Sequence, residues 1–126
     1  MLARRLLLTT LAMSALLAGC ADPPPALPHG VSLIDAQRLG KLVKVDDPAS
    51  GRTDTGTMRV AVPVRNISGA RLVLEGRATF RGAAGSESAS GWKRVFINKD
   101  SLETLEFTSL GERANDYQVE LREGNR

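Results

Sequence analysis

Residues 58–80 read MRVAVPVRNISGARLVLEGRATF, and this stretch decides the fold class. On each side of its centre apolar side chains alternate with polar or small ones, which is the pattern of a strand with one buried and one wet face. The Asn-Ile-Ser-Gly segment between the two runs is a turn signal, so the sequence predicts a β-hairpin. We expect these side chains to be buried together: Met58, Val60, Val62, Val64, Leu72, Leu74 and Phe80.

The remainder of residues 31–126 also consists of short apolar segments separated by turn signals. This pattern is typical of an all-β, antiparallel sandwich, and six or seven strands are expected. Further strands are predicted at 41–45, 92–98, 103–108 and 117–121, a helical turn ended by Gly40 at 33–39, a polar loop at 46–56 and a flexible connection at 82–91.

Two residue types add detail to this sandwich. Pro63 lacks a backbone N–H, which favours an edge strand or a bulge at its position. Aromatic residues are few, so each is expected to supply a large share of the core. The residues in question are Phe80, Trp92, Phe96 and Phe107.

The first twenty residues, MLARRLLLTTLAMSALLAGC, predict a signal peptide. Arg4 and Arg5 supply its positive start, and the apolar run at 6–17 is shorter than the roughly 20 residues that a membrane-spanning helix needs. The ending Leu-Ala-Gly-Cys resembles the lipobox of bacterial lipoproteins, in which the cysteine, here Cys20, receives lipid before cleavage. A plain secretory signal and a short N-terminal anchor are the alternatives.

These features divide the chain into a lipoprotein signal peptide at 1–19, a lipidated cysteine with a Pro-rich linker at 20–30, and a β-sandwich domain at 31–126. The linker composition predicts an extended tether of up to about 30 Å. In Gram-negative lipoproteins, Asp after the lipidated cysteine tends to retain the protein at the inner membrane, and this chain has Ala21 there. We therefore expect a lipid-anchored, periplasm-facing protein of the outer membrane.

The composition excludes several classes of function. Arg4 and Arg5 leave with the signal, so 15 of the 17 basic residues remain against all 14 acidic ones, and a nearly neutral chain argues against nucleic-acid binding. One cysteine and one histidine exclude an internal disulfide, a Cys-rich zinc site and multi-histidine metal sites. His29 lies in the linker, where a solvated side chain is expected. We expect neither an enzyme nor a cofactor.

One tripeptide matches a catalytic motif. Asp54-Thr55-Gly56 matches the catalytic tripeptide of aspartic proteases. A chain of this size could form a homodimer in which each copy supplies one of the two catalytic carboxylates. Such a motif ends a hydrophobic strand, whereas a polar segment precedes it here. We interpret the tripeptide as part of the polar loop.

A longer series of residues resembles a known family. It consists of Val62-x-Val64-x-Asn66, Leu72-x-Leu74-Glu75-x-Arg77-x-x-Phe80, Gly85 and Gly91-Trp92-Lys93-Arg94-Val95. This order is similar to the YcfL family of small bacterial lipoproteins, although Gly76, Ala78 and Gly82 replace larger residues of the family pattern. The resemblance implies an immunoglobulin-like β-sandwich on a lipid tether, in a family without an assigned enzymatic activity.

The leading hypothesis is a non-enzymatic outer-membrane lipoprotein whose β-sandwich binds an envelope protein or a cell-wall partner. The alternative is a secretion-apparatus lipoprotein that anchors an inner-membrane complex, for which the loop at 46–56 is the candidate contact. A possible partner face is predicted on the wet sides of two adjacent strands, at Arg59, Arg65, Arg71, Glu75 and Arg77. The same side chains could instead form a solvated face that keeps the sheet soluble.

Overall fold

The computed structural model describes residues 26–82, 85, 87–111 and 113–125. The predicted signal peptide, Cys20 and the first half of the linker lie outside these residues. The described elements are β1 (Val31–Leu33), α1 (Ala36–Leu39), β2 (Val43–Val45), β3 (Ala49–Arg52), β4 (Met58–Asn66), β5 (Leu72–Gly82), β6 (Glu87–Ala89), β7 (Lys93–Ile97), β8 (Leu102–Thr108) and β9 (Ala114–Glu123). No helix in this part of the chain has the length and apolar character needed to cross a membrane.

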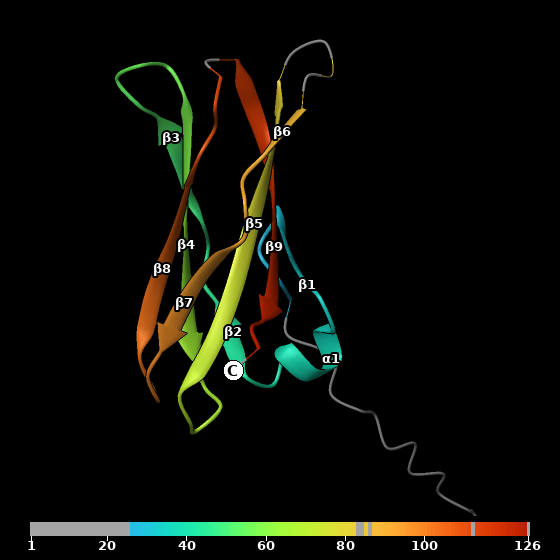
Figure 1. Ribbon diagram of the computed structural model, residues 1–126, viewed down its shortest axis with the longest axis vertical. Helices are drawn as coiled ribbons and strands as arrows, with labels where there is room; N and C mark the ends of the chain where they lie inside the picture. Colours follow the sequence, from blue (N-terminus) through green and yellow to red (C-terminus); the bar gives the residue numbers. More distant parts are fainter. Residues whose placement is uncertain (1–25, 83–84, 86, 112, 126) are drawn as a thin grey trace, which may run out of the picture.

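The strands form two sheets that pack face to face, as Figure 1 shows. Sheet A has the order β1-β9-β5-β6, and β7 pairs with the same edge of β5 as β6 does, nearer the start of β5. Sheet B has β4 at its centre, with β8 on one side and the short strands β2 and β3 on the other. All pairings are antiparallel except that of β1 with β9. The predicted all-β sandwich is confirmed.

The predicted hairpin between the two long strands is wrong, because β4 and β5 belong to different sheets. The turn at 67–71 carries the chain across the core instead of along one sheet. Both arrangements give the same alternation in sequence, since each strand buries every second side chain in either case. Here the two apolar faces point toward each other across the sandwich.

The core contains the side chains that alternation predicted. Val60, Val62, Val64 and Leu74 are fully buried, and Leu72 and Phe80 nearly so, while Met58 packs against the core from its rim. Sheet A adds Ile97, Val119 and Leu121, and sheet B adds Leu105 and Phe107.

Two of the four aromatic residues are wrongly predicted as core. Phe96 is 49% exposed, and Trp92 is only partly buried. In β7 it is Ile97 and Val95 that point inward, opposite Leu72 and Leu74 of β5. Because side chains alternate along a strand, Phe96 must then point outward, away from the core.

Two segments predicted as irregular contain short strands. The expected loop at 46–56 holds β3, which forms a hairpin with β4, and the expected connection at 82–91 holds β6, which pairs with Thr79–Arg81 of β5. With β1 these additions bring the strands to nine among the described residues, compared with the six or seven predicted. The helical turn is confirmed: it is α1, with Gly40 at its C-terminus.

Pro63 sits neither on an edge strand nor at a bulge. It lies in the central strand of sheet B, opposite Thr104 of β8. Its carbonyl accepts a hydrogen bond from the Asp46 N–H, just beyond β2, and its nitrogen faces the same side because both groups of a strand residue point to one neighbour. That side is the gap between β2 and β3, where no N–H is needed for the ladder.

Candidate interaction surface

The five residues of the predicted partner face are divided between the two sides of the sandwich. Arg59 and Arg65 point outward from β4 in sheet B, whereas Glu75 and Arg77 point outward from β5 in sheet A, and Arg71 immediately precedes β5. The expectation that they share one continuous face is therefore wrong. One continuous face would require β4 and β5 to be neighbours in the same sheet, and they belong to different sheets.

The outer face of sheet A brings two of them, Glu75 and Arg77, together with residues of β7 and β9. Glu75 lies directly opposite Arg94 of β7 on one side and Arg122 of β9 on the other. Its Oε1 accepts a hydrogen bond from Nε of Arg122 at 3.0 Å, and its Oε2 one from Nη2 of Arg94 at 3.4 Å. Arg77 lies opposite Glu120, and their side chains form an ion pair at 3.1 Å.

Trp92, immediately before β7, carries two of these guanidinium groups over its indole ring. The guanidinium carbon of Arg122 is 3.7 Å from the ring centroid, and that of Arg77 is 4.6 Å away. Such cation–π contacts are favourable by about 0.5–1 kcal/mol at exposed sites. We define the Trp92 cluster as Glu75, Arg77, Trp92, Arg94, Glu120 and Arg122.

The carboxylate of Glu75 lies between Arg94 and Arg122 in this cluster. Its side chain is 14% exposed. The hydrogen bond from Arg122 holds the pKa of Glu75 below its usual value, against the opposing effect of its partial burial, and Arg94 acts in the same direction as Arg122. The carboxylate therefore stays ionised at neutral pH, and the cluster holds three arginines against two acidic residues.

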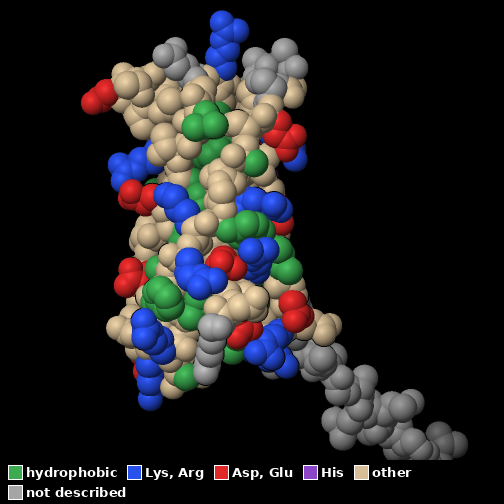
Figure 2. All heavy atoms as spheres, in the orientation of Figure 1, with side chains coloured by type: hydrophobic (Ala, Val, Ile, Leu, Met, Phe, Trp, Pro, Cys, Tyr) green, Lys and Arg blue, Asp and Glu red, His purple; other side chains and the backbone are tan. Residues whose placement is uncertain are grey.

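Beside the Trp92 cluster, one arginine is held by an aromatic ring instead of a carboxylate. The guanidinium carbon of Arg71 lies 4.8 Å from the ring centroid of Phe96, which is half exposed. An open cleft with a volume of about 490 Å³ lies here, lined by Ala70, Arg71, Val73 and Phe96. In Figure 1 β5 and β7 lie in front of β4, and Figure 2, drawn from the same side, shows basic, acidic and hydrophobic side chains intermixed on this face.

The outer face of sheet B is simpler. Arg59 is paired with Glu106 of β8, and Arg65 lies opposite the exposed Leu102. Arg65 makes no ion pair with any residue that the structure describes. No aromatic side chain of β4 or β8 points outward on this side, since Phe107 is buried.

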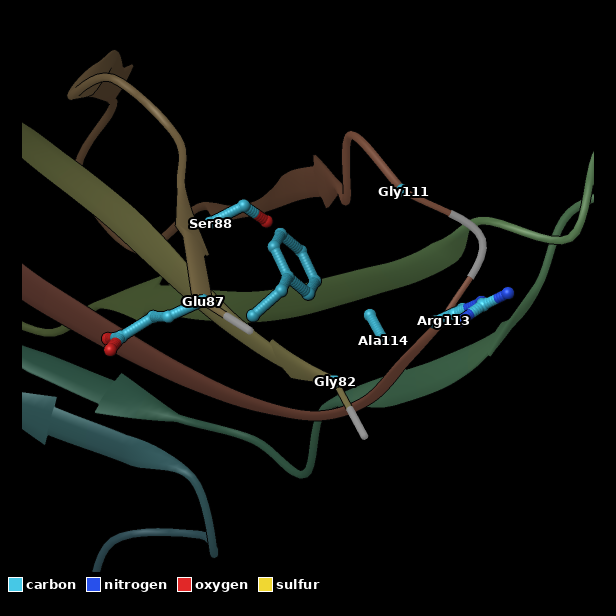
Figure 3. A pocket seen from close by; sticks show the side chains of 7 residues that line it. Gly82, Glu87, Ser88, Gly111, Arg113 and Ala114 are labelled. Atoms are coloured by element: carbon cyan, nitrogen blue, oxygen red, sulfur yellow. The ribbon is translucent and has the colours of Figure 1, made fainter. Parts of the chain in front are cut away.

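A smaller cavity of about 150 Å³ lies at the end of the sandwich opposite the turn between β4 and β5. It lies between β5, β6 and the start of β9. Figure 3 shows its lining, in which the side chains of Glu87 and Arg113 point away from each other and from the cavity. Among the lining residues that the structure describes, no polar side chains converge on the cavity. Asp54, of the protease-like tripeptide, is exposed in the turn between β3 and β4, and within the described ranges no three His, Cys, Asp or Glu residues are grouped to hold a metal ion.

Sequence reasoning missed most of the Trp92 cluster. The sequence predicts Trp92 in the core, and it does not place Arg94, Glu120 or Arg122 at a partner face. Alternation within each strand could have placed Trp92, Arg94 and Phe96 on one face of β7, but their meeting with Glu75 depends on the register of three strands.

The fold is similar to that of solved structures of small bacterial proteins, two of which follow. The crystal structure of a DUF1425 family member from Shewanella sp. pv-4 is 16% identical in sequence, with a TM-score of 0.57, and the match covers 67% of this chain and 80% of that one. Campylobacter jejuni cj0090 is 15% identical, with a TM-score of 0.57, over 75% of this chain and 98% of that one. No family model and no curated protein matches the sequence. At these identities the likeness concerns the fold alone.

Proposed function

We propose that this chain is a non-enzymatic lipoprotein similar to the YcfL family, anchored in the outer membrane through Cys20, and that its periplasmic β-sandwich binds an envelope protein or a cell-wall partner. The observation that carries the binding proposal is the outer face of sheet A. This face combines Trp92, the half-exposed Phe96 and several arginines. Trp, Phe and Arg are the residue types that are enriched in protein interfaces.

Within this face the Arg71–Phe96 pair is the best placed for a partner. The guanidinium groups of Arg77 and Arg122 already have carboxylate partners, so a ligand would have to compete with Glu120 and Glu75. Arg71 contacts no carboxylate among the described residues and borders the open cleft. A carboxylate or phosphate group of the partner could approach it without displacing an ion pair.

The anchoring alternative receives no support from residues 46–56. Instead of a long protruding loop, this segment contains β3, whose residues Ala49–Arg52 pair with Met58–Ala61 of β4. The turn is closed by hydrogen bonds between Thr53 and Thr57, both backbone to backbone and through their hydroxyl groups. Such a short turn offers little area for a partner helix.

The lipid anchor gives the first prediction. Cys20→Ser in the full precursor should release the domain from the membrane fraction, because the serine hydroxyl cannot take the thioether-linked lipid. Mass spectrometry of the wild-type mature N-terminus and membrane fractionation of both forms measure this. A wild-type protein that is soluble in the periplasm, with an unmodified Cys20, would contradict the proposal.

The binding face gives the second prediction. Arg71→Gln combined with Phe96→Ser should remove most cross-linked partner in cells, with the melting temperature shifted by only a few degrees, because both side chains lie outside the core. Cross-linking in vivo followed by mass spectrometry, with thermal unfolding of the purified variant, provides the readout.

Sheet B supplies a matched control. Arg65→Gln combined with Leu102→Ser also removes one arginine and one exposed apolar side chain, which lie opposite each other on β4 and β8. This variant should keep the partner. If both variants keep every partner at unchanged stability, the arginines serve only as a solvated surface and the binding face is wrong.

A further inference from the structure

One end of the sandwich, here called the tether end, is formed by the segment around α1 at 34–44, the turn at 67–71 and the turn at 98–101, together with the strand residues beside them. These segments are joined by hydrogen bonds: Ile67 N–H to the Leu42 carbonyl at 2.8 Å, and the Asn66 amide to the carbonyls of Ala70 and Asn98. The first described linker residues, Ala26 and Leu27, lie here against α1 and β2. Figure 1 shows α1 and the turn between β4 and β5 at this same end.

Exposed apolar side chains are concentrated at the tether end. Of the six large hydrophobic residues exposed in the described chain, five are found there, each with 37–49% of its surface accessible. They are Leu27, Ile34, Ile67, Phe96 and Leu102. The sixth, Leu110, lies in the loop between β8 and β9 at the opposite end. Among the described residues, large exposed apolar side chains are therefore more numerous at the tether end than at the opposite end.

The charges at the tether end are predominantly basic. The basic residues are Arg38, Lys41, Lys44, Arg65, Arg71 and Lys99, and the acidic ones are Asp35, Asp100, Glu103 and Glu123. Glu123 is already paired with Arg38 at 2.8 Å. Lys41, Lys44 and Lys99 form no ion pair within the described part of the chain, so their ammonium groups are available to an anionic surface.

The length of chain before the described residues limits how far this end can move from an anchor. Ala26 is six residues after Cys20, and a fully extended chain advances at most about 3.6 Å per residue. With the proposed lipid on Cys20, Ala26 is therefore held within about 22 Å of the lipid. Such a short link gives an effective local concentration on the order of millimolar, at which even a weak contact is populated.

We propose that the tether end contacts the phospholipid surface of the membrane that holds the anchor, with Ile34 and Ile67 entering the headgroup region and the three unpaired lysines facing anionic headgroups. This inference rests on the proposed lipidation for its geometry, but its contact surface belongs to the folded domain. The opposite end, with β3 and Leu110, then points away from the membrane. Arg71 and Phe96 lie at the border between the tether end and the outer face of sheet A, and the Trp92 cluster on that face stays open to a partner.

The test uses the lipidated protein in vesicles of phosphatidylethanolamine and phosphatidylglycerol. Because lipid blocks the thiol of Cys20, Ile67→Cys supplies a single reactive thiol for an environment-sensitive dye, and Leu110→Cys is the matched control at the opposite end. We expect lipids with brominated chains to quench the dye at position 67 several-fold more than the dye at position 110. Equal quenching at the two positions would overturn the proposal.

A charge variant tests the lysines separately. The charge variant combines Lys41→Gln, Lys44→Gln and Lys99→Gln in the Ile67→Cys protein. It should show reduced quenching, and its affinity for the vesicles should fall by about tenfold or more. The reason is that each Lys near an anionic surface favours binding. The Ile67→Cys protein with its native lysines should show the same reduction in quenching when the vesicles are made of phosphatidylcholine, which carries no net charge. Quenching that persists undiminished in either case would show that the lysines do not face anionic lipid.

The same dye distinguishes this inference from the lipidation itself. The unlipidated chain, Cys20→Ser with Ile67→Cys, should still be quenched at lipid concentrations on the order of millimolar. Quenching there, in a protein whose wild-type Cys20 proves unmodified, would refute the anchor and support the contact. A lipidated wild-type protein with no quenching at position 67 would support the anchor and refute the contact.

Discussion

Replacing Asn66 with alanine is expected to lower the free energy of unfolding by about 3–5 kcal/mol, because each buried polar group that loses its partner costs about 1–3 kcal/mol. Asn66 is fully buried at the end of β4. Its amide nitrogen donates to the carbonyls of Ala70, Ile97 and Asn98 at 2.7, 2.9 and 3.2 Å. Its Oδ1 accepts from the backbone N–H and the hydroxyl of Ser68.

These bonds explain why one side chain should matter so much. They join the turn between β4 and β5 to the turn between β7 and β8, and each of these turns passes from one sheet to the other. Alanine would leave the buried Ile97 carbonyl without this donor and would remove the bonds to the part-buried carbonyls of Ala70 and Asn98, one in each turn. The expected loss is therefore a loosening of the two connections that hold the sheets together at this end.

Urea unfolding of the purified domain measures the effect, with two controls. Ser68→Ala removes only hydroxyl hydrogen bonds in the same turn and should cost about 1 kcal/mol. Asn66→Asp keeps the shape but replaces the donor with an acceptor facing three carbonyl oxygens, so it should be at least as damaging as alanine. An Asn66→Ala protein within about 1 kcal/mol of wild type would contradict this role.

The alternation in β4 predicted which side chains are buried but not which strands pair. Val60, Val62 and Val64 face the core whether β4 pairs with β5 or faces it across the sandwich, so the pattern could not separate a hairpin from a crossing between sheets. The position of Asn66 in the sequence is also informative. It continues the buried phase of the valines, and a polar side chain in that phase needs internal partners.

The errors among the aromatic residues have a different cause. Residue type predicts Trp92 and Phe96 in the core, although Val95 and Ile97 are the residues of β7 that point inward. Alternation alone was sufficient to correct this. The short strand β3, by contrast, has no buried side chain, and it exists because β4 offers it an open edge. A strand of that kind has no hydrophobic pattern to read.

The candidate surface depended on information that one sequence does not contain. Glu75 and Arg77 were correctly placed on a wet face, but their partners come from β7 and β9, about twenty and about forty-five residues later in the chain. Only the strand order and register bring those side chains together. For the same reason, Arg59 and Arg65 could not be separated from them before the sheets were known.

Phe107→Ala is expected to lower the free energy of unfolding by about 3–5 kcal/mol, the range usual for removing a large aromatic side chain from a core. The Phe107 ring is 1% exposed and packs against the backbone of Gly76 in the opposite sheet, where a β-carbon would come within 3.1 Å of its Cζ atom. The Lys93 ammonium lies over the same ring, 5.4 Å from its centroid.

The chain contains its own control for this substitution. Phe96→Ala removes the same atoms from a side chain that is half exposed on the outer face of sheet A, so it should cost under about 1 kcal/mol, mostly through the lost contact with Arg71. Chemical unfolding of the two variants under the same conditions compares them directly. A small folded domain has roughly 5–15 kcal/mol of stability, so Phe107→Ala removes a large part of it and Phe96→Ala very little. Equal losses in the two variants would mean that the two sheets do not enclose Phe107 as described, because burial is the main difference between the two rings.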